Sequence, residues 1–372
     1  MRTHNIYGKL ISYSRIMNAW KKVKANGGVG GIDQVSIDRF SQDLEINLQQ
    51  LLNELKGKTY AAQPVKRMYI TKGPGEFRPL GLPTVRDKIV QQLVVSVLTP
   101  MYEGIFHPSS VGYRPGRSAY DAFNLLFKQL ISGLTWVYDA DILSFFDNMN
   151  HHILLDLIRR NIADESLMLL IKQWLKAGIV EDGIITIPGK GSPQGSVISP
   201  ILATIYLNQL DWALDAAELK FVRYADDLLV MCTNESQVEC AVRVAHEIKH
   251  ELRLELSHEL IVNLASLDSK VNYMGMEIKV SNDGYKVRRG NKAMTKLRDK
   301  ITNLAETGRV KELEELIQGN ANYCSQVIQA AQAAKNMVNY EELIQQAIQI
   351  DKYITGLGIT GITPMAQILG AS

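Results

Sequence analysis

The sequence is poor in cysteine and lacks long apolar runs, internal repeats and low-complexity linkers. Its three cysteines, Cys232, Cys240 and Cys324, are too few and too scattered for a zinc cluster, and they suit a reducing cytosol. No apolar run is long enough to cross a membrane, and the basic N-terminus lacks the apolar stretch of a signal peptide. These absences predict a cytoplasmic protein with no membrane partner and no need for disulfides.

Net charge is also nearly absent, since 41 Lys and Arg against 39 Asp and Glu leave +2. The basic residues are nevertheless grouped: one group precedes Asp33, a second lies between Lys66 and Lys88, and a third runs from Lys286 to Lys311. Each group could follow a phosphate backbone, although such a run is more often a solvated face. Charge alone leaves nucleic-acid binding open.

Periodicity predicts a mixture of strands and helices. The predicted strands are 68–70, 136–143, 221–224 and 228–231, with a hairpin over 179–187 and a tight turn at 73–75. The predicted helices are 37–55 up to Gly57, 86–98 up to Pro100, one after Asn150, one from Ser199, and three around 297–304, 310–317 and 327–331. Strand signals stop beyond Gly284. An antiparallel sheet with segregated helices is α+β, and we expect two or three directly packed subdomains.

Three acids fall where predicted strands end. Asp141 closes the strand that begins at Trp136, and Asp226 and Asp227 occupy the tip of the hairpin over 221–231. Nucleotidyl transfer uses two divalent cations about 3.5–4 Å apart, and Mg²⁺ prefers carboxylate oxygens. Asp139 shares a strand face with Asp141 and is therefore a rival ligand. A solvated turn is the alternative explanation for the paired acids.

Four motifs follow one another along the chain. They are Arg78-Pro79-Leu80-Gly81-Leu82-Pro83 with Gly112-Tyr113-Arg114-Pro115-Gly116-Arg117-Ser118, Asp141-Ile142 with Phe145-Phe146-Asp147, Ser192-Pro193-Gln194-Gly195-Ser196, and Tyr224-Ala225-Asp226-Asp227. In this order they resemble the boxes of reverse transcriptases, in particular the bacterial group II intron lineage. The resemblance covers roughly residues 14–280. It implies a right-hand polymerase with an N-terminal extension (1–66), fingers and palm (67–282), a helical thumb (283–332) and a C-terminal helical segment (333–372).

The resemblance implies roles at the catalytic centre. Asp141 and Asp226 correspond to the main ligands of two Mg²⁺ ions, Asp227 to a supporting ligand, and the Ile142 carbonyl to a further metal contact. The implied nucleotide-binding residues are Lys72, Arg78, Phe146, Gln194 and Gly195. Among these, Lys72 and Arg78 would neutralise the triphosphate. Phe146 would exclude a 2′-hydroxyl, and Gly195 would let the backbone approach the nucleotide. The alternatives are solvated loop charges for the two basic residues and core packing beside Phe145 for Phe146.

The segment after residue 283 resembles the thumb of this lineage. The residues implied to grip the template–primer duplex are Lys286, Arg288, Arg289, Lys292, Lys296 and Arg298. A solvated helix face is the alternative. The helical pattern over 336–356 has two interpretations: the helices contact a second copy of the chain, or they support the thumb.

The sequence departs from the family in two places. Leu260 stands where the family usually has a lysine that is a candidate proton donor to pyrophosphate, and His258 or Lys270 could take that role. Tyr273-Met274-Gly275-Met276 resembles the primer-grip segment with altered residues. We recognise no DNA-binding or nuclease domain after the thumb, which argues against self-sufficient intron mobility.

We therefore predict an RNA-templated DNA polymerase with an RNA template, a DNA primer or product, and dNTPs as partners. By analogy with stand-alone bacterial members, the template would be a dedicated noncoding RNA copied in anti-phage defence. The alternatives are an RNA-dependent RNA polymerase, a maturase-like RNA-binding splicing factor, and a structural oligomer built on the C-terminal helices.

Overall fold

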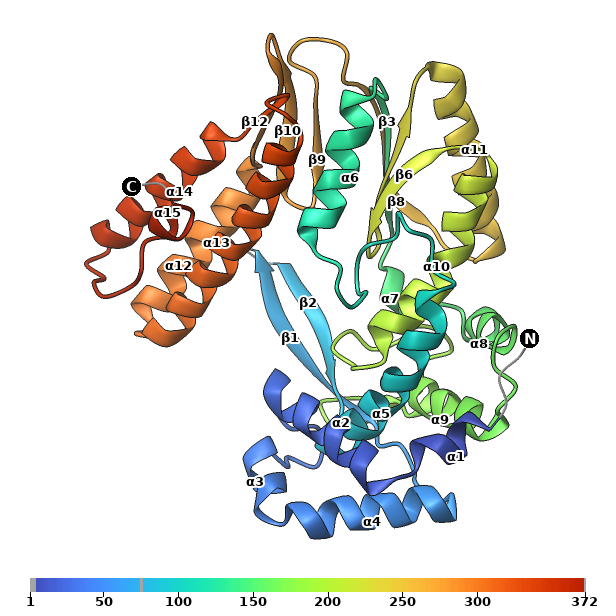
Figure 1. Cartoon of the computed structure of the whole chain (residues 1–372). Coiled ribbons are helices and arrows are strands. Elements are labelled where there is room, and N and C mark those ends of the chain that lie inside the picture. The colour runs from blue at the N-terminus through green and yellow to red at the C-terminus, as the bar shows by residue number, and fades with distance from the viewer. Residues whose placement is uncertain (1–4, 74–75, 371–372) are drawn as a thin grey trace. The chain divides into compact units, whose positions relative to one another are not determined.

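A computed structural model of the chain describes residues 5–73 and 76–370, except for the side chains of residues 71–76 (Figure 1). The predicted turn at 73–75 thus falls largely outside the described residues, and so does the side chain of Lys72. The chain forms two compact units, each made of three segments. The first comprises Met1–His107, Leu143–Leu210 and Ile248–Glu255, and the second comprises Pro108–Ile142, Asp211–Glu247 and Leu256–Ser372. Both contain strands and helices, which confirms the α+β class.

The first unit contains a small sheet, and its strands are preceded and followed along the chain by helices. Its strands follow the order β2-β1-β4-β5. They are β1 (Val65–Gly73), β2 (Glu76–Leu82), β4 (Ile179–Glu181) and β5 (Ile184–Thr186). Its helices are α1 (Ile6–Leu10), α2 (Tyr13–Asn26), α3 (Ile37–Gln42), α4 (Leu44–Gly57), α5 (Val85–Glu103), α7 (Phe145–Asn148), α8 (His151–Arg159), α9 (Glu165–Lys176) and the first part of α10 (Ser199–Ala216).

Two helix boundaries in this unit differ from the prediction. The expected helix over 37–55 breaks at Asp43, whose backbone is not helical, and the Asn47 amide donates to the Phe40 carbonyl across the break. Pro100 does not end α5, which continues to Glu103. A proline in the last turn removes only one backbone hydrogen bond, while Leu98 and Tyr102 on either side are buried. Burial of these side chains therefore outweighs the lost bond.

The second unit holds two sheets, whose strand pairs are antiparallel except for the parallel pair of β11 and β12. One has the order β6-β7-β3-β8 and the other β12-β11-β10-β9. The strands are β3 (Trp136–Ile142), β6 (Lys220–Tyr224), β7 (Asp227–Cys232), β8 (Leu256–Asn263), β9 (Lys270–Tyr273), β10 (Met276–Ser281), β11 (Gly284–Arg289) and β12 (Val338–Asn339). The helices are α6 (Ala119–Ile131), the last part of α10, all but the last four residues of α11 (Glu235–Glu251), α12 (Asn291–Glu306), α13 (Val310–Ala333), α14 (Glu341–Gly356) and α15 (Met365–Ile368).

The prediction that strands stop at Gly284 is wrong. β11 pairs with β10 along its whole length, and its side chains alternate between the core and the surface. Tyr285 and Val287 supply the buried positions, a period-two signal hidden among basic residues. The two helices expected after residue 310 are one helix, α13, because Leu313, Ile317, Ala321 and Cys324 form an unbroken buried stripe past Gly319.

The core of the second unit lies where α6 and α13 meet the sheets. Phe123 of α6 contacts Tyr273 of β9 with ring centroids 5.7 Å apart, and it also contacts Tyr323 of α13 at 6.4 Å. These buried aromatic contacts fix α13 against the turn that follows β9. In the described part of the chain, no helix is both long and apolar enough to span a membrane.

Candidate active site

Strand pairing brings the predicted acids of the second unit to one end of a sheet. β3 pairs with β7 up to Ala140 opposite Leu228, so Asp141 and Asp227 follow at the same end of these strands. Tyr224 pairs with Asp227 across the tight β6–β7 hairpin, which leaves Ala225 and Asp226 at its tip. The three acids therefore lie at one end of the same sheet. Their meeting depends on β3 lying beside β7, which no local pattern specifies.

A β-bulge sets the exposure of Asp141. In the pairing of β3 with β8, Asp141 faces His258 and Ile142 faces Leu256, so Ser257 is the additional residue. The Ser257 hydroxyl lies 3.2 Å from Asp141 Oδ2 and 3.3 Å from the Asp141 carbonyl oxygen. Asp141 is exposed, so its carboxylate is open to solvent and to a solvated cation. Ser257 was missed by the sequence analysis, since a bulge leaves no signal in composition.

Asp227 is anchored by the segment that resembles the primer grip. The Met274 backbone N–H donates to Asp227 Oδ2 at 3.1 Å, and the Tyr323 hydroxyl donates to the Met274 carbonyl oxygen at 2.7 Å. Met274 has a φ of 50° and Gly275 a φ of 81°, so the turn is tight. The altered residues of this segment thus retain a backbone donor that holds one carboxylate.

The carboxylates at this end of the sheet affect one another electrostatically. The pKa of Asp227 is raised to about 7: burial is the largest cause, the Met274 N–H opposes it, and the charges of Asp139, Asp141 and Asp226 add to the rise. Burial also raises the pKa of Asp139 to about 6, opposed by His258 and assisted by Asp141. Asp139 is 9% exposed, and its Oδ2 lies 3.8 Å from His258 Nε2. Asp139 therefore belongs to the same cluster of charge and remains a rival ligand.

This donor set fits hard divalent cations. Its members offer carboxylate oxygens, which Mg²⁺ prefers, and their mutual repulsion is of the kind that a cation relieves. Among the described residues, no three Asp, Glu, His or Cys side chains converge into a preformed metal-binding group. Asp139, Asp141 and Asp227 each face a protein group instead, namely His258, Ser257 and the Met274 N–H. The two-ion arrangement therefore stays a prediction.

The raised pKa of Asp227 predicts how stability depends on pH without metal. The folded-state value of about 7 lies above the ordinary value of 3.8, so this group contributes stability below pH 3.8 that is lost as pH rises through about 7. With a chelator present, we expect the unfolding temperature of the wild type to fall as the pH is raised from 5 to 8. The unfolding free energy of Asp227→Asn should fall by about 1–3 kcal/mol less than that of the wild type over this range.

Thermal unfolding followed by circular dichroism measures this difference. Asp283→Asn is the matched control, since Asp283 is an exposed acid in the turn between β10 and β11. The control should keep the wild-type pH dependence. Equal pH dependence of Asp227→Asn and the wild type would contradict the prediction.

The predicted nucleotide-binding residues lie in the first unit. The Phe146 carbonyl oxygen accepts from the Ser192 N–H at 2.7 Å, and the Gln194 carbonyl oxygen accepts from the Gly81 N–H at 2.6 Å. These bonds join α7 to the segment 192–195 and that segment to β2, which also carries the exposed Arg78. Four of the five predicted residues are thereby brought into one connected set; the side chain of Lys72 lies outside the described part.

Two of these residues have packing roles in the first unit. Gly195 has a φ of 99°, and a Cβ there would lie 2.8 Å from the Gly81 carbonyl oxygen, so glycine is required by the approach to β2. Phe146 is 8% exposed and packs edge-to-face against Phe145 at 5.5 Å. Core packing is therefore part of its role, and a contact with the sugar remains a prediction.

Three of the six basic residues implied to grip nucleic acid lie on a strand, although the segment after residue 283 resembles a helical thumb. Lys286, Arg288 and Arg289 lie on β11, and only Lys292, Lys296 and Arg298 lie on α12. Arg289 is 8% exposed, and its backbone pairs with the Gln346 amide. Arg288 is bound by Glu277 and Glu342.

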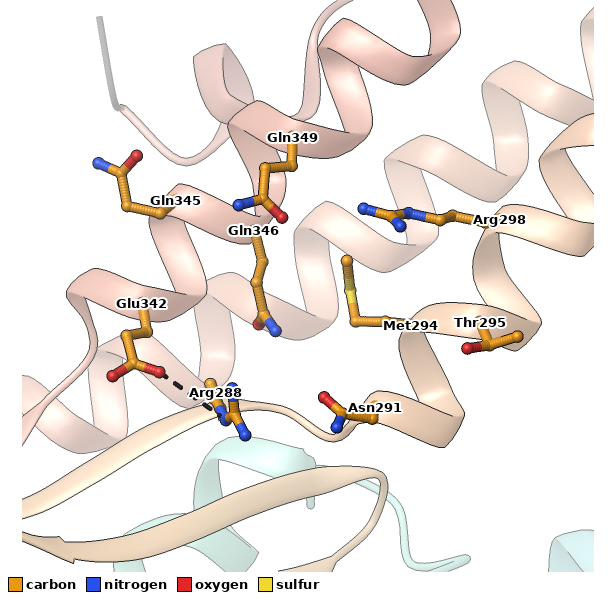
Figure 2. A pocket seen from close by; sticks show the side chains of 9 residues that line it. All are labelled: Arg288, Asn291, Met294, Thr295, Arg298, Glu342, Gln345, Gln346 and Gln349. Atoms are coloured by element: carbon orange, nitrogen blue, oxygen red, sulfur yellow. Dashed lines mark ion pairs between the residues drawn. The ribbon is translucent and has the colours of Figure 1, made fainter.

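Arg288 and Arg298 line a pocket between β11, α12 and α14 (Figure 2). Figure 2 shows the side chains of Gln345, Gln346 and Gln349 gathered on the α14 side of this pocket. The Arg298 guanidinium lies 5.8 Å from the centre of the Tyr353 ring. Lys292 and Lys296 are not among the residues that line the pocket. The basic run is thus divided between two surfaces.

The alternative proton donors differ in their surroundings. Lys270 forms an ion pair with Glu277 at 3.0 Å, whereas His258 lies beside Asp139. Leu260, at the position where the family has lysine, faces Asp139 in the pairing of β8 with β3 and is 40% exposed. Of the two substitutes, only His258 contacts the carboxylate cluster.

Comparison with known proteins places these features in context. Residues 70–278 match the family described as "Reverse transcriptase (RNA-dependent DNA polymerase)". Protein YkfC of Escherichia coli (strain K12) is 39% identical over 185 residues, 49% of this chain and 49% of YkfC. The group II intron-encoded protein LtrA of Lactococcus lactis subsp. cremoris is 36% identical over 234 residues, 62% of this chain and 38% of LtrA. These matches confirm the resemblance to the group II intron lineage.

The chain spans about half of the length of YkfC and less than half of that of LtrA. A solved structure of telomerase from Candida albicans aligns with 90% of this chain and 66% of that chain, with a TM-score of 0.48 and 11% identity.

Proposed function

The chain belongs to the reverse transcriptase family, and we propose that it synthesises DNA on an RNA template with two Mg²⁺ ions held by Asp141, Asp226 and Asp227. The observation that supports the proposal most strongly is the carboxylate cluster at the end of β3 and the β6–β7 hairpin. The Ile142 carbonyl oxygen is a further proposed metal contact. Two ions bound by these residues would activate the 3′-hydroxyl of the primer and neutralise the triphosphate.

The residues of the chain itself contribute positioning and charge. Asp141 stands exposed beside the Ser257 hydroxyl, and Asp227 is fixed by the Met274 N–H, so the two acids have different freedom to move. Arg78 and Lys72 are proposed to bind the triphosphate, where the planar guanidinium of Arg78 matches two phosphate oxygens. Phe146 is proposed to select dNTPs, with Gln194 and Gly195 beside it in the connected set.

Primer extension with purified protein tests the proposal. An RNA template with a DNA primer should be extended in the presence of dNTPs and Mg²⁺ and not in the presence of EDTA. Extension with NTPs at a similar rate would favour an RNA-dependent RNA polymerase. RNA binding without extension on any template would favour a maturase-like splicing factor instead.

The natural template is proposed, by analogy with stand-alone bacterial members of the lineage, to be a dedicated noncoding RNA copied in anti-phage defence. Sequencing of the nucleic acid that co-purifies with the protein tests this, because it identifies template and product together. Recovery of one abundant RNA with its complementary DNA is the expected result. A random sample of cellular RNA would contradict a dedicated template.

Mass measurement of the purified protein tests the proposed contact between copies through the C-terminal helices.

Lys292 and Lys296 on α12 are proposed to contact the phosphates of the duplex. The binding constant falls as salt rises, and each lost phosphate contact should make the slope of log binding constant against log salt concentration less negative by about 1. The double variant Lys292→Ala with Lys296→Ala should therefore reduce the steepness of this slope by about 1–2. Fluorescence anisotropy with a labelled template–primer at several salt concentrations measures the slope. Lys352→Ala on α14 is the matched control, an exposed lysine outside the predicted set. An unchanged slope in the double variant would remove α12 from the interface.

A further inference from the structure

A buried arginine lies directly behind the hairpin that carries Asp226. Arg223, the residue before Tyr224 on β6, is 1% exposed, and its partner Asp211 on α10 is 0% exposed. Arg223 Nε donates to Asp211 Oδ1 at 2.7 Å and Nη2 donates to Oδ2 at 2.5 Å. This is a two-point pair, the geometry in which a guanidinium is held most rigidly.

The same guanidinium reaches the tip of the hairpin. Arg223 Nη1 donates to the Ala225 carbonyl oxygen at 2.6 Å, while Nη2 also donates to Ser110 Oγ at 2.7 Å. The carbonyl of Ala225 belongs to the peptide bond whose nitrogen is that of Asp226. The orientation of that peptide therefore depends directly on the position of the arginine.

The hairpin tip needs such support because its backbone is strained. Ala225 has a φ of 62°, a conformation that costs an L-residue with a Cβ roughly 1–3 kcal/mol. The segment before α6 closes on the tip from the other side, since a Cβ on Gly112 would lie 2.3 Å from the Ala225 nitrogen. Backbone bonds from Arg223 N–H to the Ser109 carbonyl and from Val111 N–H to the Arg223 carbonyl, at 2.9 and 2.8 Å, hold that segment along β6.

We propose that Arg223, oriented by Asp211, is a positioning residue that holds the Ala225 carbonyl and thereby fixes the direction of the Asp226 carboxylate. The inference rests on the proposed function, because it assigns Asp226 a metal-binding role. An ordinary buried ion pair affects only folding stability, whereas the pair of Arg223 and Asp211 would also affect the metal site. Arg223 touches neither substrate nor metal in this scheme and acts through the backbone of Ala225.

The test uses a paired replacement that keeps the interior filled. Removing one partner alone leaves a buried charge and destabilises the fold, whereas replacing both by apolar residues of similar size is often neutral. Arg223→Met with Asp211→Leu therefore removes the donor to Ala225 while it keeps the packing. Arg223→Lys keeps a positive charge beside Asp211 but lacks the planar fork that serves three partners at once. Ser110→Ala removes one partner of the guanidinium and leaves its bond to Ala225 in place.

The expected result is a folded double variant with an impaired metal site. Its unfolding should stay cooperative, its Mn²⁺ affinity measured by electron paramagnetic resonance should fall about tenfold, and its kcat should fall roughly 10²-fold with little change in the KM for template–primer. Arg223→Lys should lie between the double variant and the wild type, and Ser110→Ala should remain close to the wild type.

A double variant that folds and keeps wild-type Mn²⁺ affinity and kcat would overturn the inference. If the double variant does not fold, Arg223→Lys becomes the test. Unchanged Mn²⁺ affinity in folded Arg223→Lys would then overturn the inference. Failure of the proposed function is a separate outcome. It would appear as an inactive wild type on every template, and the Mn²⁺ titrations of wild type and variants would still decide the positioning role.

Discussion

Asp226→Asn is expected to lower the rate of DNA synthesis by at least about 10²–10³-fold, the scale on which loss of one group that stabilises transition-state charge is felt. The amide keeps the size of the side chain and removes its charge. Because Asp226 stands at the tip of a two-residue turn, the variant should fold as the wild type does. Asp141→Asn is expected to have an effect of the same order. Single-turnover primer extension at saturating Mg²⁺ measures the chemical step directly.

Two further acids make this result interpretable. Asp283→Asn removes an exposed charge from the same unit and should leave the rate within about twofold, since isolated surface charges contribute little. Asp139→Asn decides between the rival ligands on β3. Slow synthesis in Asp141→Asn with a nearly normal rate in Asp139→Asn would assign the metal to Asp141, and the reverse pattern would reassign it. Normal synthesis in Asp226→Asn would contradict the proposed catalytic site.

Phe146→Ala is expected to raise the use of NTPs relative to dNTPs by roughly 10–200-fold, because an apolar contact that excludes one small group has about that discriminating power. The gain should come from faster NTP incorporation and not from a general loss of dNTP binding. Competition between a dNTP and the matching NTP at one template position, read by the mobility of the extended primer, measures the ratio.

Phe145→Ala provides the control for lost packing. The two rings contact one another, and Phe145 is 2% exposed against 8% for Phe146, so both truncations open a cavity in the same region. Each should cost about 3–5 kcal/mol of stability, which requires that both assays run well below the lowered unfolding temperature. Equal relaxation of selectivity in both variants would show that Phe146 acts through packing alone.

Short-range patterns were sufficient to predict the acids and the elements that carry them. The aromatic and β-branched content of the strand before Asp141, the hairpin around Asp226 and the helix after Asn150 all depend on residues close in sequence, and each element agrees with the structure. Family resemblance added the order of the motifs and the lineage. The domain boundaries at 66, 282 and 332 and the nucleotide-binding roles stay predictions.

Long-range contacts account for what the sequence analysis missed. The sequence analysis did not single out Arg223, and only the pairing of β6 with residues 109–111 and the neighbouring α10 shows that it is buried. Ser257 acts through a bulge, and Met274 acts through its backbone rather than its side chain. The alternation of β11 was obscured because its basic residues were interpreted as a helix surface.

The bond from the Tyr323 hydroxyl to the Met274 carbonyl has a mechanical consequence. Tyr323 belongs to α13, and the Met274 residue that it holds also fixes Asp227. A displacement of α13 along its axis therefore pulls on the loop and changes the freedom of a carboxylate in the cluster. Met274 thus links the helix to the sheet that carries the acids, so a load applied to α13 reaches the Asp227 side chain through two hydrogen bonds.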